Sequence, residues 1–336
     1  MPRASTVRIA FAALLIHGCL AAQTEPERLI EAGHWKRART IVEARLADAP
    51  AGPLANFLLS QVRNAFGDRD SPLPLAEKAV ALDGRAAKYH RQVAECLGVM
   101  AQHSNVIQQV LLARRFRSEI DTALALDPRD TQAVRDLMEF YLLAPAIIGG
   151  DSRRATETAA RLLAIDPVAG MLAQARLAAY RKQTADAEAC LRRAAEIQPP
   201  SYQARVALAL FYVSSAPPRF DEALKSAAGA LALDPDRVDA YAILADIHAA
   251  RAQWAALDAV LEAAAREVPD DLTPFYRAAQ RLLACGSDLP RAESYLRTYL
   301  AQPPEGNAPS AADARAQLAL VLEKQRRTVA KTERPQ

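Results

Sequence analysis

The sequence predicts an all-α protein in which about eight helix hairpins follow one another and a single helix closes the array. Composition is the first observation: 51% of the 336 residues are hydrophobic, only 6% are aromatic, and glycine occurs 12 times. Abundant alanine beside leucine, arginine and glutamate is typical of helices, whereas a β-sandwich would require more β-branched and aromatic residues and more glycine-rich turns. The other two observations are a period near 34 residues and small residues at fixed places in each period.

The charge is nearly balanced, with 42 lysines and arginines against 39 aspartates and glutamates and a formal charge of +3. A protein that binds nucleic acid through its phosphates carries a clear excess of basic side chains. The large apolar fraction excludes an intrinsically disordered chain. We therefore expect a folded protein whose partners are not nucleic acids.

The N-terminus has the pattern of an export signal. Arg3 and Arg8 precede Ile9–Ile16, an apolar run that is too short for a membrane span of about 20 residues. Small residues follow, and they allow cleavage just before or just after Ala22. The sequence thus predicts a signal peptide over residues 1–22 and a bacterial protein that is periplasmic or secreted.

Two other interpretations of the N-terminal segment stay open. Ile16–Cys19 resembles a lipobox, so the mature chain could instead be a lipoprotein anchored through Cys19. The segment could also form a buried first helix. No later stretch approaches 18 unbroken apolar residues, so we expect no integral membrane span after the signal is removed.

Helix-ending segments recur along the rest of the chain. Apolar residues at helical spacing run up to each segment, and most segments close on proline, which lacks an N–H and cannot continue the helix. Gly84 ends one of them as a predicted helix C-terminal glycine. The final residues lie at positions 50, 84, 128, 167, 199, 235, 269 and 303, at spacings of 34, 44, 39, 32, 36, 34 and 34. This period predicts eight helix pairs with two insertions.

Within each period, alanine recurs where two helices would cross, and bulky residues recur in the preceding helix. A small residue that faces a large one lets the two helices of a hairpin interlock. The alanines are Ala38, Ala155, Ala187 and Ala223 in one set and Ala79, Ala123, Ala194, Ala230 and Ala264 in the other. The bulky residues are Leu97, Leu137, Tyr141, Leu208, Tyr212, Tyr241 and Leu244.

At these positions the chain resembles the tetratricopeptide repeat (TPR) family, whose 34-residue pattern is W-x2-L-G-x2-Y…A-x3-F…P. The resemblance covers nearly all of residues 25–325, although alanine replaces aromatic residues at many signature positions. It implies a right-handed superhelical solenoid over residues 23–327 that binds partners in a concave groove. The repeat Val238–Pro269 carries the signature residues Tyr241, Leu244, Ala245, Trp254, Ala264 and Pro269.

The two long spacings locate the insertions. The stretch between positions 84 and 128 contains no internal proline, so it predicts lengthened helices over about 85–101 and 105–126. In Leu142–Gly150, Pro145 ends a helix, two glycines turn the chain, and Asp151 can cap the next helix. These insertions resemble those of a group of exported bacterial TPR proteins without an assigned function.

The C-terminal end predicts a closing helix and a tail. Ala311–Gln325 has the pattern of a first helix, but no second helix follows. A terminal helix that covers the last apolar face is what a solenoid requires for solubility. Residues 328–336 are polar, and we expect them to be disordered.

The sequence contains no motif for catalysis, a cofactor or a metal. It lacks HExxH, GxSxG, GxGxxG and the P-loop pattern, and its histidines are isolated. The cysteines after the signal, Cys96, Cys190 and Cys285, are too far apart to form a zinc or disulfide framework. We therefore predict no catalytic, cofactor-binding or metal-binding residue.

The resemblance places partner contacts on the outward positions of the first helices. These positions carry both charges and little aromatic surface, unlike the strongly basic groove with which TPR domains clamp acidic peptide tails. We expect a protein or an extended peptide as the partner. The candidate groove residues are Gln132, Arg135, Glu139, Arg181, Lys182, Gln203, Asp239, Asp246, Tyr276 and Gln280.

The leading functional hypothesis is an exported, non-enzymatic scaffold for protein–protein interaction. A second is an accessory subunit of a cell-envelope assembly or secretion complex, which would co-purify with a stable complex. A third is an enzyme or small-molecule binder. This third class requires an enclosed pocket with converging polar groups, and the sequence offers no motif for one.

Overall fold

The computed structural model describes residues 24–48 and 52–332. Every regular element in these ranges is helical, which confirms the predicted all-α fold. No helix in the same ranges is long and apolar enough to cross a membrane. The predicted signal peptide at residues 1–22, with Cys19, lies outside the described residues.

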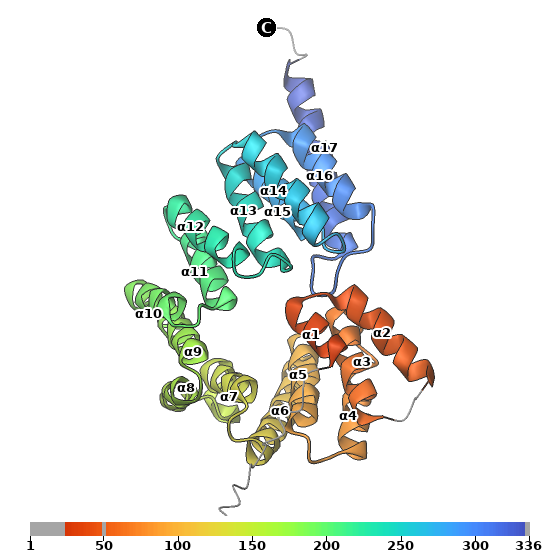
Figure 1. The fold of residues 1–336 in the computed structure, drawn as a ribbon, viewed down its shortest axis with the longest axis vertical. Helices are drawn as coiled ribbons and strands as arrows, with labels where there is room; N and C mark the ends of the chain where they lie inside the picture. The colour runs from red at the N-terminus through yellow and green to blue at the C-terminus, as the bar shows by residue number, and fades with distance from the viewer. Residues whose placement is uncertain (1–23, 49–51, 333–336) are drawn as a thin grey trace, which may run out of the picture.

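Within the described ranges the helices pair into eight successive hairpins, each packed on the next, and α17 (Ala311–Thr332) closes the array. This arrangement confirms the predicted solenoid (Figure 1). The hairpins are α1 (Glu25–Ala32) with α2 (Trp35–Asp48), α3 (Pro53–Ala65) with α4 (Pro72–Leu82), α5 (Ala87–Gln102) with α6 (Val106–Leu126), α7 (Thr131–Leu143) with α8 (Ser152–Ile165), α9 (Pro167–Tyr180) with α10 (Thr184–Glu196), α11 (Tyr202–Ser214) with α12 (Phe220–Leu231), α13 (Val238–Ala250) with α14 (Trp254–Glu267), and α15 (Thr273–Cys285) with α16 (Leu289–Leu300).

The predicted small and bulky residues form the interlocking core. All nine alanines of the two predicted sets are at most 1% exposed, and the seven bulky residues are buried as well. An alanine at a helix crossing brings the two backbones close, so a large side chain of the partner helix fills the space above it. The abundance of alanine and the low aromatic content therefore follow from the packing of the hairpins.

Both predicted insertions are confirmed. Helices α5 and α6 end within two residues of the predicted bounds. The second insertion contains a 3-10 helix, η1 (Ala146–Ile148), and Gly149 follows it with a left-handed φ of 107°. The side chain of Asp151 accepts hydrogen bonds from the backbone N–H groups of Arg153 and Arg154, at 2.8 and 3.1 Å, and caps α8 as predicted.

The ends of two helices, α17 and α4, differ from the prediction. Helix α17 continues to Thr332, past the predicted end of the solenoid at residue 327, because no glycine or proline interrupts it and Arg327 pairs with Glu323 one turn earlier. Residues 333–336 lie outside the described residues. Gly84 does not adopt a left-handed φ. Instead, the Asp83 carboxylate accepts a hydrogen bond from the backbone N–H of Arg85 at 3.1 Å beyond the end of α4.

Replacing Gly170 by alanine should destabilise the protein by about 3 kcal/mol, because the added methyl would overpack the α8–α9 crossing. An ideal Cβ at Gly170 would lie 2.1 Å from the Cα atom of Leu163 and 2.5 Å from its backbone nitrogen, so the helices must separate. Thermal unfolding measures the effect. The Gly98→Ala variant is the control, because its Cβ meets only Phe116 at an ordinary 3.7 Å and alanine favours the helix. Equal melting temperatures for the two variants would contradict this account.

The superhelix turns far enough for its two ends to meet, which the sequence did not predict. In Figure 1 the segment between α16 and α17 lies against the N-terminal hairpins. The buried Glu305 carboxylate accepts hydrogen bonds at its Oε1 atom from the backbone N–H groups of Lys36 and Gly306, both at 2.8 Å. The backbone N–H of Asn307 donates to the carbonyl of Ala65 at 2.7 Å. The bonds from Lys36 to Glu305 and from Asn307 to Ala65 join residues that are separated by most of the chain.

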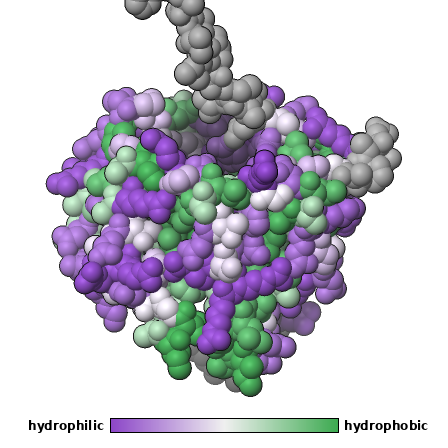
Figure 2. Space-filling model, turned by 90° about the horizontal axis from the view of Figure 1, so that it is seen from below, coloured by the Kyte–Doolittle hydropathy of each residue, from purple (hydrophilic) through white to green (hydrophobic). Residues whose placement is uncertain are grey.

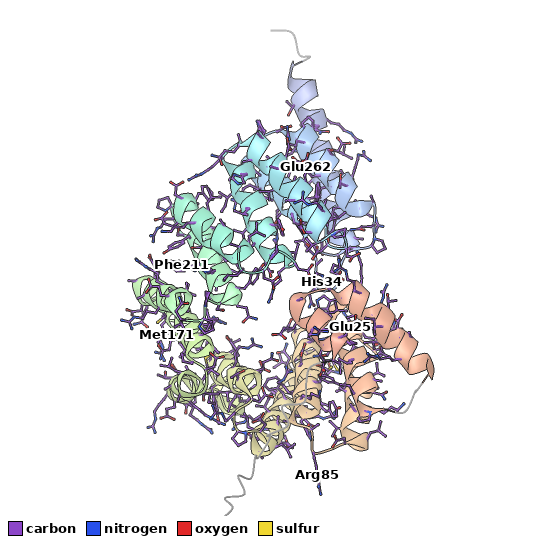
Figure 3. The ribbon with its side chains drawn as sticks, in the orientation of Figure 1. Glu25, His34, Arg85, Met171, Phe211 and Glu262 are labelled. Atoms are coloured by element: carbon purple, nitrogen blue, oxygen red, sulfur yellow. The ribbon has the colours of Figure 1, made fainter. Side chains whose placement is uncertain are left out.

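Acidic side chains from other connections between hairpins also reach the start of α2. Arg37 Nε lies 2.6 Å from Asp270 Oδ2, and the buried His34 has its Nε2 atom 3.0 Å from Asp236 Oδ2. Figure 3 shows His34 where the two halves meet. The N-terminus of a helix carries partial positive charge, so the acidic side chains of Asp236, Asp270 and Glu305 stabilise the start of α2. We use the name ring closure for the contact of the N-terminal hairpins with these three residues and Asn307.

Candidate partner-binding cavity

The inner face of the N-terminal half holds a cavity of about 1000 Å³. Helices α1, α3, α5, α6 and α7 supply most of its wall, and Trp35, Ala144, Ile148, Gln203 and Asn307 complete it. Trp35 and Asn307 belong to the segments that meet in the ring closure. The wall of the cavity thus depends on the contact between the two ends of the superhelix.

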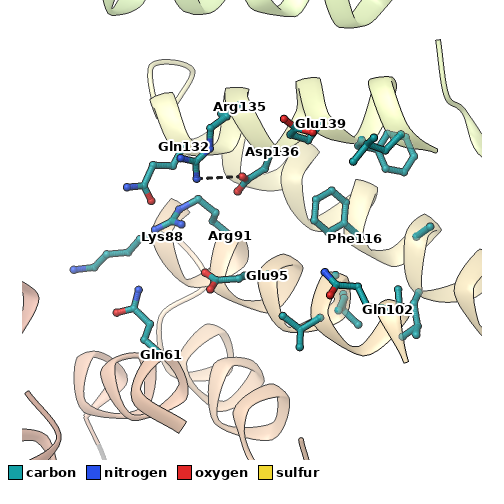
Figure 4. Close-up of a pocket in the computed structure, with 18 of the residues that line it drawn as sticks. Gln61, Lys88, Arg91, Glu95, Gln102, Phe116, Gln132, Arg135, Asp136 and Glu139 are labelled. Atoms are coloured by element: carbon teal, nitrogen blue, oxygen red, sulfur yellow. Dashed lines mark ion pairs between the residues drawn. The ribbon is translucent and has the colours of Figure 1, made fainter. Parts of the chain in front are cut away.

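Charged side chains from two helices line one part of the cavity (Figure 4). Helix α5 contributes Lys88, Arg91 and Glu95, spaced so that they share one helix face. Helix α7 contributes a similar row, in which Arg135 and Asp136 form an ion pair at 3.6 Å. Arg91 lies 3.7 Å from Asp130, the N-cap residue of α7. The two helices therefore present rows of mixed charge to the same space.

Two carboxyl groups in this part carry raised pKa values. Solvent reaches Glu95 through the cavity, but the surrounding protein desolvates its carboxyl group, and this desolvation is the largest cause of its raised pKa. Desolvation also raises the pKa of Asp136, against the opposing effect of Arg135 and Arg91. The charge of Asp136 raises the pKa of Glu95 further. A cation bound between these carboxyl groups would relieve both effects.

The other part of the cavity is apolar. Phe116 of α6 and Phe140 of α7 stack with their ring centroids 5.9 Å apart, and Leu112 and Leu143 extend the surface. Glutamines occur in both parts of the cavity, with Gln61 and Gln132 beside the charged residues and Gln102 near Phe116 (Figure 4). Their amide groups both donate and accept hydrogen bonds, which suits an extended peptide backbone. The glutamines that line the cavity are Gln61, Gln102, Gln109, Gln132 and Gln203.

The structure brings only some of the predicted groove residues together. Gln132, Arg135, Glu139 and Gln203 line the cavity. Asp239, Asp246 and Gln280 lie farther along the chain on α13 and α15, outside this cavity. Asp246 is engaged there by Arg281, at 2.6 Å between Oδ2 and Nη2.

Three predicted groove residues lie in places that the prediction did not expect. Tyr276 is a core residue, only 5% exposed, and its ring packs against Tyr299 with centroids 5.3 Å apart. Its outward placement was wrong because a one-residue change in helical register turns a side chain by about 100°. Arg181 and Lys182 follow the end of α9 at the turn to α10, and Arg181 donates to Thr156 Oγ1 of α8 at 2.6 Å.

Sequence reasoning missed Lys88, Arg91 and Glu95. Their signal was present as charged residues at positions i, i+3 and i+7 of a predicted helix. It was missed because the long insertion displaced this helix from the 34-residue register. Within the described residues, no group of three or more histidines, cysteines, aspartates or glutamates is placed to hold a metal ion.

No protein-family model matches the chain, and no curated protein matches its sequence. Solved structures match its fold. Yeast Tom70 superimposes with a TM-score of 0.58 at 14% identity, over 93% of this chain and 66% of Tom70. The chain thus spans just under two thirds of the length of Tom70.

Two bacterial TPR proteins match with lower scores. The protein from Parabacteroides merdae has a TM-score of 0.43 at 14% identity, over 88% of this chain and 96% of its own. A thermophilic TPR protein from Thermus thermophilus has a TM-score of 0.42 at 20% identity, over 62% of this chain and all of its own.

The chain therefore has the helix-hairpin solenoid fold of TPR proteins. Solenoids of this class present extended concave surfaces to protein or peptide partners.

Proposed function

We propose that the protein is an exported, non-catalytic scaffold that holds an extended segment of a partner protein in the cavity of its N-terminal half. The observation that carries this proposal is the combination, in one open cavity, of a stacked aromatic pair, two rows of mixed charge and five glutamines. A protein segment offers the matching groups, since its backbone bonds to amides and its side chains meet both apolar and charged walls.

Export is supported by the sequence pattern of residues 1–22, in which two arginines precede a short apolar run and small residues. On this proposal the scaffold works in the periplasm or outside the cell, and the partner is another protein of that compartment. The mature chain then begins at Ala22 or Gln23, or at a lipidated Cys19.

Site-specific crosslinking tests the proposal. A photoreactive amino acid in place of Gln132, in the cavity wall, should capture a defined protein segment from living cells. The same amino acid in place of Glu157, an exposed position of α8 outside the cavity, should not capture it. Mass spectrometry of the conjugate identifies the captured segment and the N-terminal residue of the scaffold. Capture of the same proteins from both positions, or a scaffold that retains Met1, would contradict the proposal.

A further inference from the structure

The two insertions in the repeat pattern meet in space. Helix α6 has 21 residues, whereas the second helices of the other hairpins have 11 to 14. Its extra turns come from the first insertion, and η1 comes from the second. Helix α6 packs against η1. Segments that depart from the regular repeat therefore build one local feature.

This feature exposes apolar side chains. Val106, Ile107 and Leu111 of α6, with Leu143 and Ile147 near η1, are between 57% and 88% exposed. They are the five most exposed large apolar side chains in the described part of the chain. We call these five residues the apolar lip. Seen from below, the molecule shows hydrophobic patches among hydrophilic side chains (Figure 2). Apolar residues clustered in this way mark interaction sites, whereas single ones are ordinary.

The apolar lip continues into the cavity. Leu143 belongs to both, and Gln109, Leu112 and Ile148, from the same two segments, line the cavity. The stacked Phe116 and Phe140 lie next, toward the interior. A bound chain could thus contact the lip, the aromatic pair and the charged rows without leaving the protein surface.

The carboxyl groups of Glu95 and Asp136 determine which charge the bound segment should carry beside its apolar residues. In the described residues no lysine, arginine or histidine side chain lies within 4.0 Å of the Glu95 carboxylate, whose hydrogen-bond donor is the neutral amide of Asn64 at 3.3 Å. The carboxylate of Asp136 lies in the same cavity and meets Arg135 only at 3.6 Å. Because, among the described residues, the desolvated Glu95 carboxylate has no cation within 4.0 Å and Asp136 has only its ion pair with Arg135, a lysine or arginine of the partner would be stabilised there.

We propose that the apolar lip and the Glu95–Asp136 pair together bind a protein segment in which a run of aliphatic residues adjoins a lysine or arginine. The aliphatic run lies on the lip and the aromatic pair, and the basic side chain lies between the two carboxylates. This inference rests on the proposed function and adds the chemistry of the partner to it.

Fluorescence anisotropy with synthetic peptides tests the inference, using protein purified from the cells that produce it. The probe peptide has two arginines ahead of four leucines that alternate with serine. One comparison peptide carries glutamate for arginine, and another carries serine for leucine. The lip variant combines Ile107→Gln, Leu111→Gln and Ile147→Ser. Its control combines Leu210→Gln with Leu320→Gln, which replace exposed leucines elsewhere.

We expect the lip variant to bind the probe at least about tenfold more weakly than the control does, because it loses apolar burial. The Glu95→Gln, Asp136→Asn double variant should lose its preference for the arginine peptide over the glutamate peptide. Undiminished binding of the probe by the lip variant would overturn the inference, and the crosslinking from Gln132 would show separately whether the proposed function stands. A second result would also overturn the inference. If the unmodified protein cosediments with phosphatidylglycerol vesicles and the lip variant does not, the apolar lip binds a membrane and not a protein segment.

Discussion

Replacing Gly306 by alanine should open the superhelix and weaken binding in the cavity. An ideal Cβ at Gly306 would lie 2.6 Å from both Cβ and Cγ of Trp35, at the root of that side chain, where rotation brings no relief. The segment around Gly306 must therefore leave α2, and the hydrogen bonds from Lys36 to Glu305 and from Asn307 to Ala65 break. Overpacking of this kind costs about 3 kcal/mol.

Small-angle X-ray scattering measures the opening as a larger radius of gyration. Because Trp35 and Asn307 also line the cavity, crosslinking from Gln132 should fall in the same variant. The control is Gly52→Ala, since an ideal Cβ at Gly52 meets no atom within 4 Å. A Gly306→Ala protein with the radius of gyration and the crosslinking yield of the control would show that the ring closure does not support the cavity.

A rise in pH should loosen the same contact. Burial, with the charge of Asp271, raises the pKa of Glu305 to about 7, against the opposing effects of its two N–H donors and of Lys36. The ordinary value of 4.5 applies once the contact is lost. Between these two values the closed form binds a proton that the open form does not, so the stability of the closed form falls as pH rises from 4.5 to 7 and is level above 7. The difference amounts to about 3 kcal/mol.

The Glu305→Gln variant should lack this part of the pH dependence, because its amide oxygen still accepts the two N–H bonds but cannot ionise. Urea unfolding followed by Trp35 fluorescence in a Trp254→Phe background reports on α2, where the closure lies. The midpoint should fall between pH 5.5 and pH 8 with Glu305 and much less with glutamine. Glu95, Asp136 and Asp271 also have raised pKa values and contribute the same sign to both proteins. Identical pH profiles would therefore exclude Glu305 as the source.

Much of the fold was predictable because the interactions that specify each hairpin join residues close together in the sequence. A proline that ends a helix, an alanine at a crossing such as Ala123 or Ala230, and an aspartate that caps a helix such as Asp151 act within one or two turns or one hairpin. The prediction that Tyr276 lies in the groove was wrong, although it concerns a single helix. The repeat pattern located that helix but did not fix its rotation about its own axis, and the side chain of Tyr276 is buried. The charged row of α5 was missed because an insertion displaced it from the repeat.

The amino-acid sequence by itself determined the helix pairs, their order, both insertions and the closing helix, because the interactions that specify them lie close together in the chain. Only the tertiary structure decided that Glu305 reaches Lys36 and that the two insertions share one surface. Small rotations between successive hairpins add up over the whole array, and their sum sets which distant residues meet. The cavity depends on that sum, because its wall joins α1 and α7 to Asn307 near the start of α17.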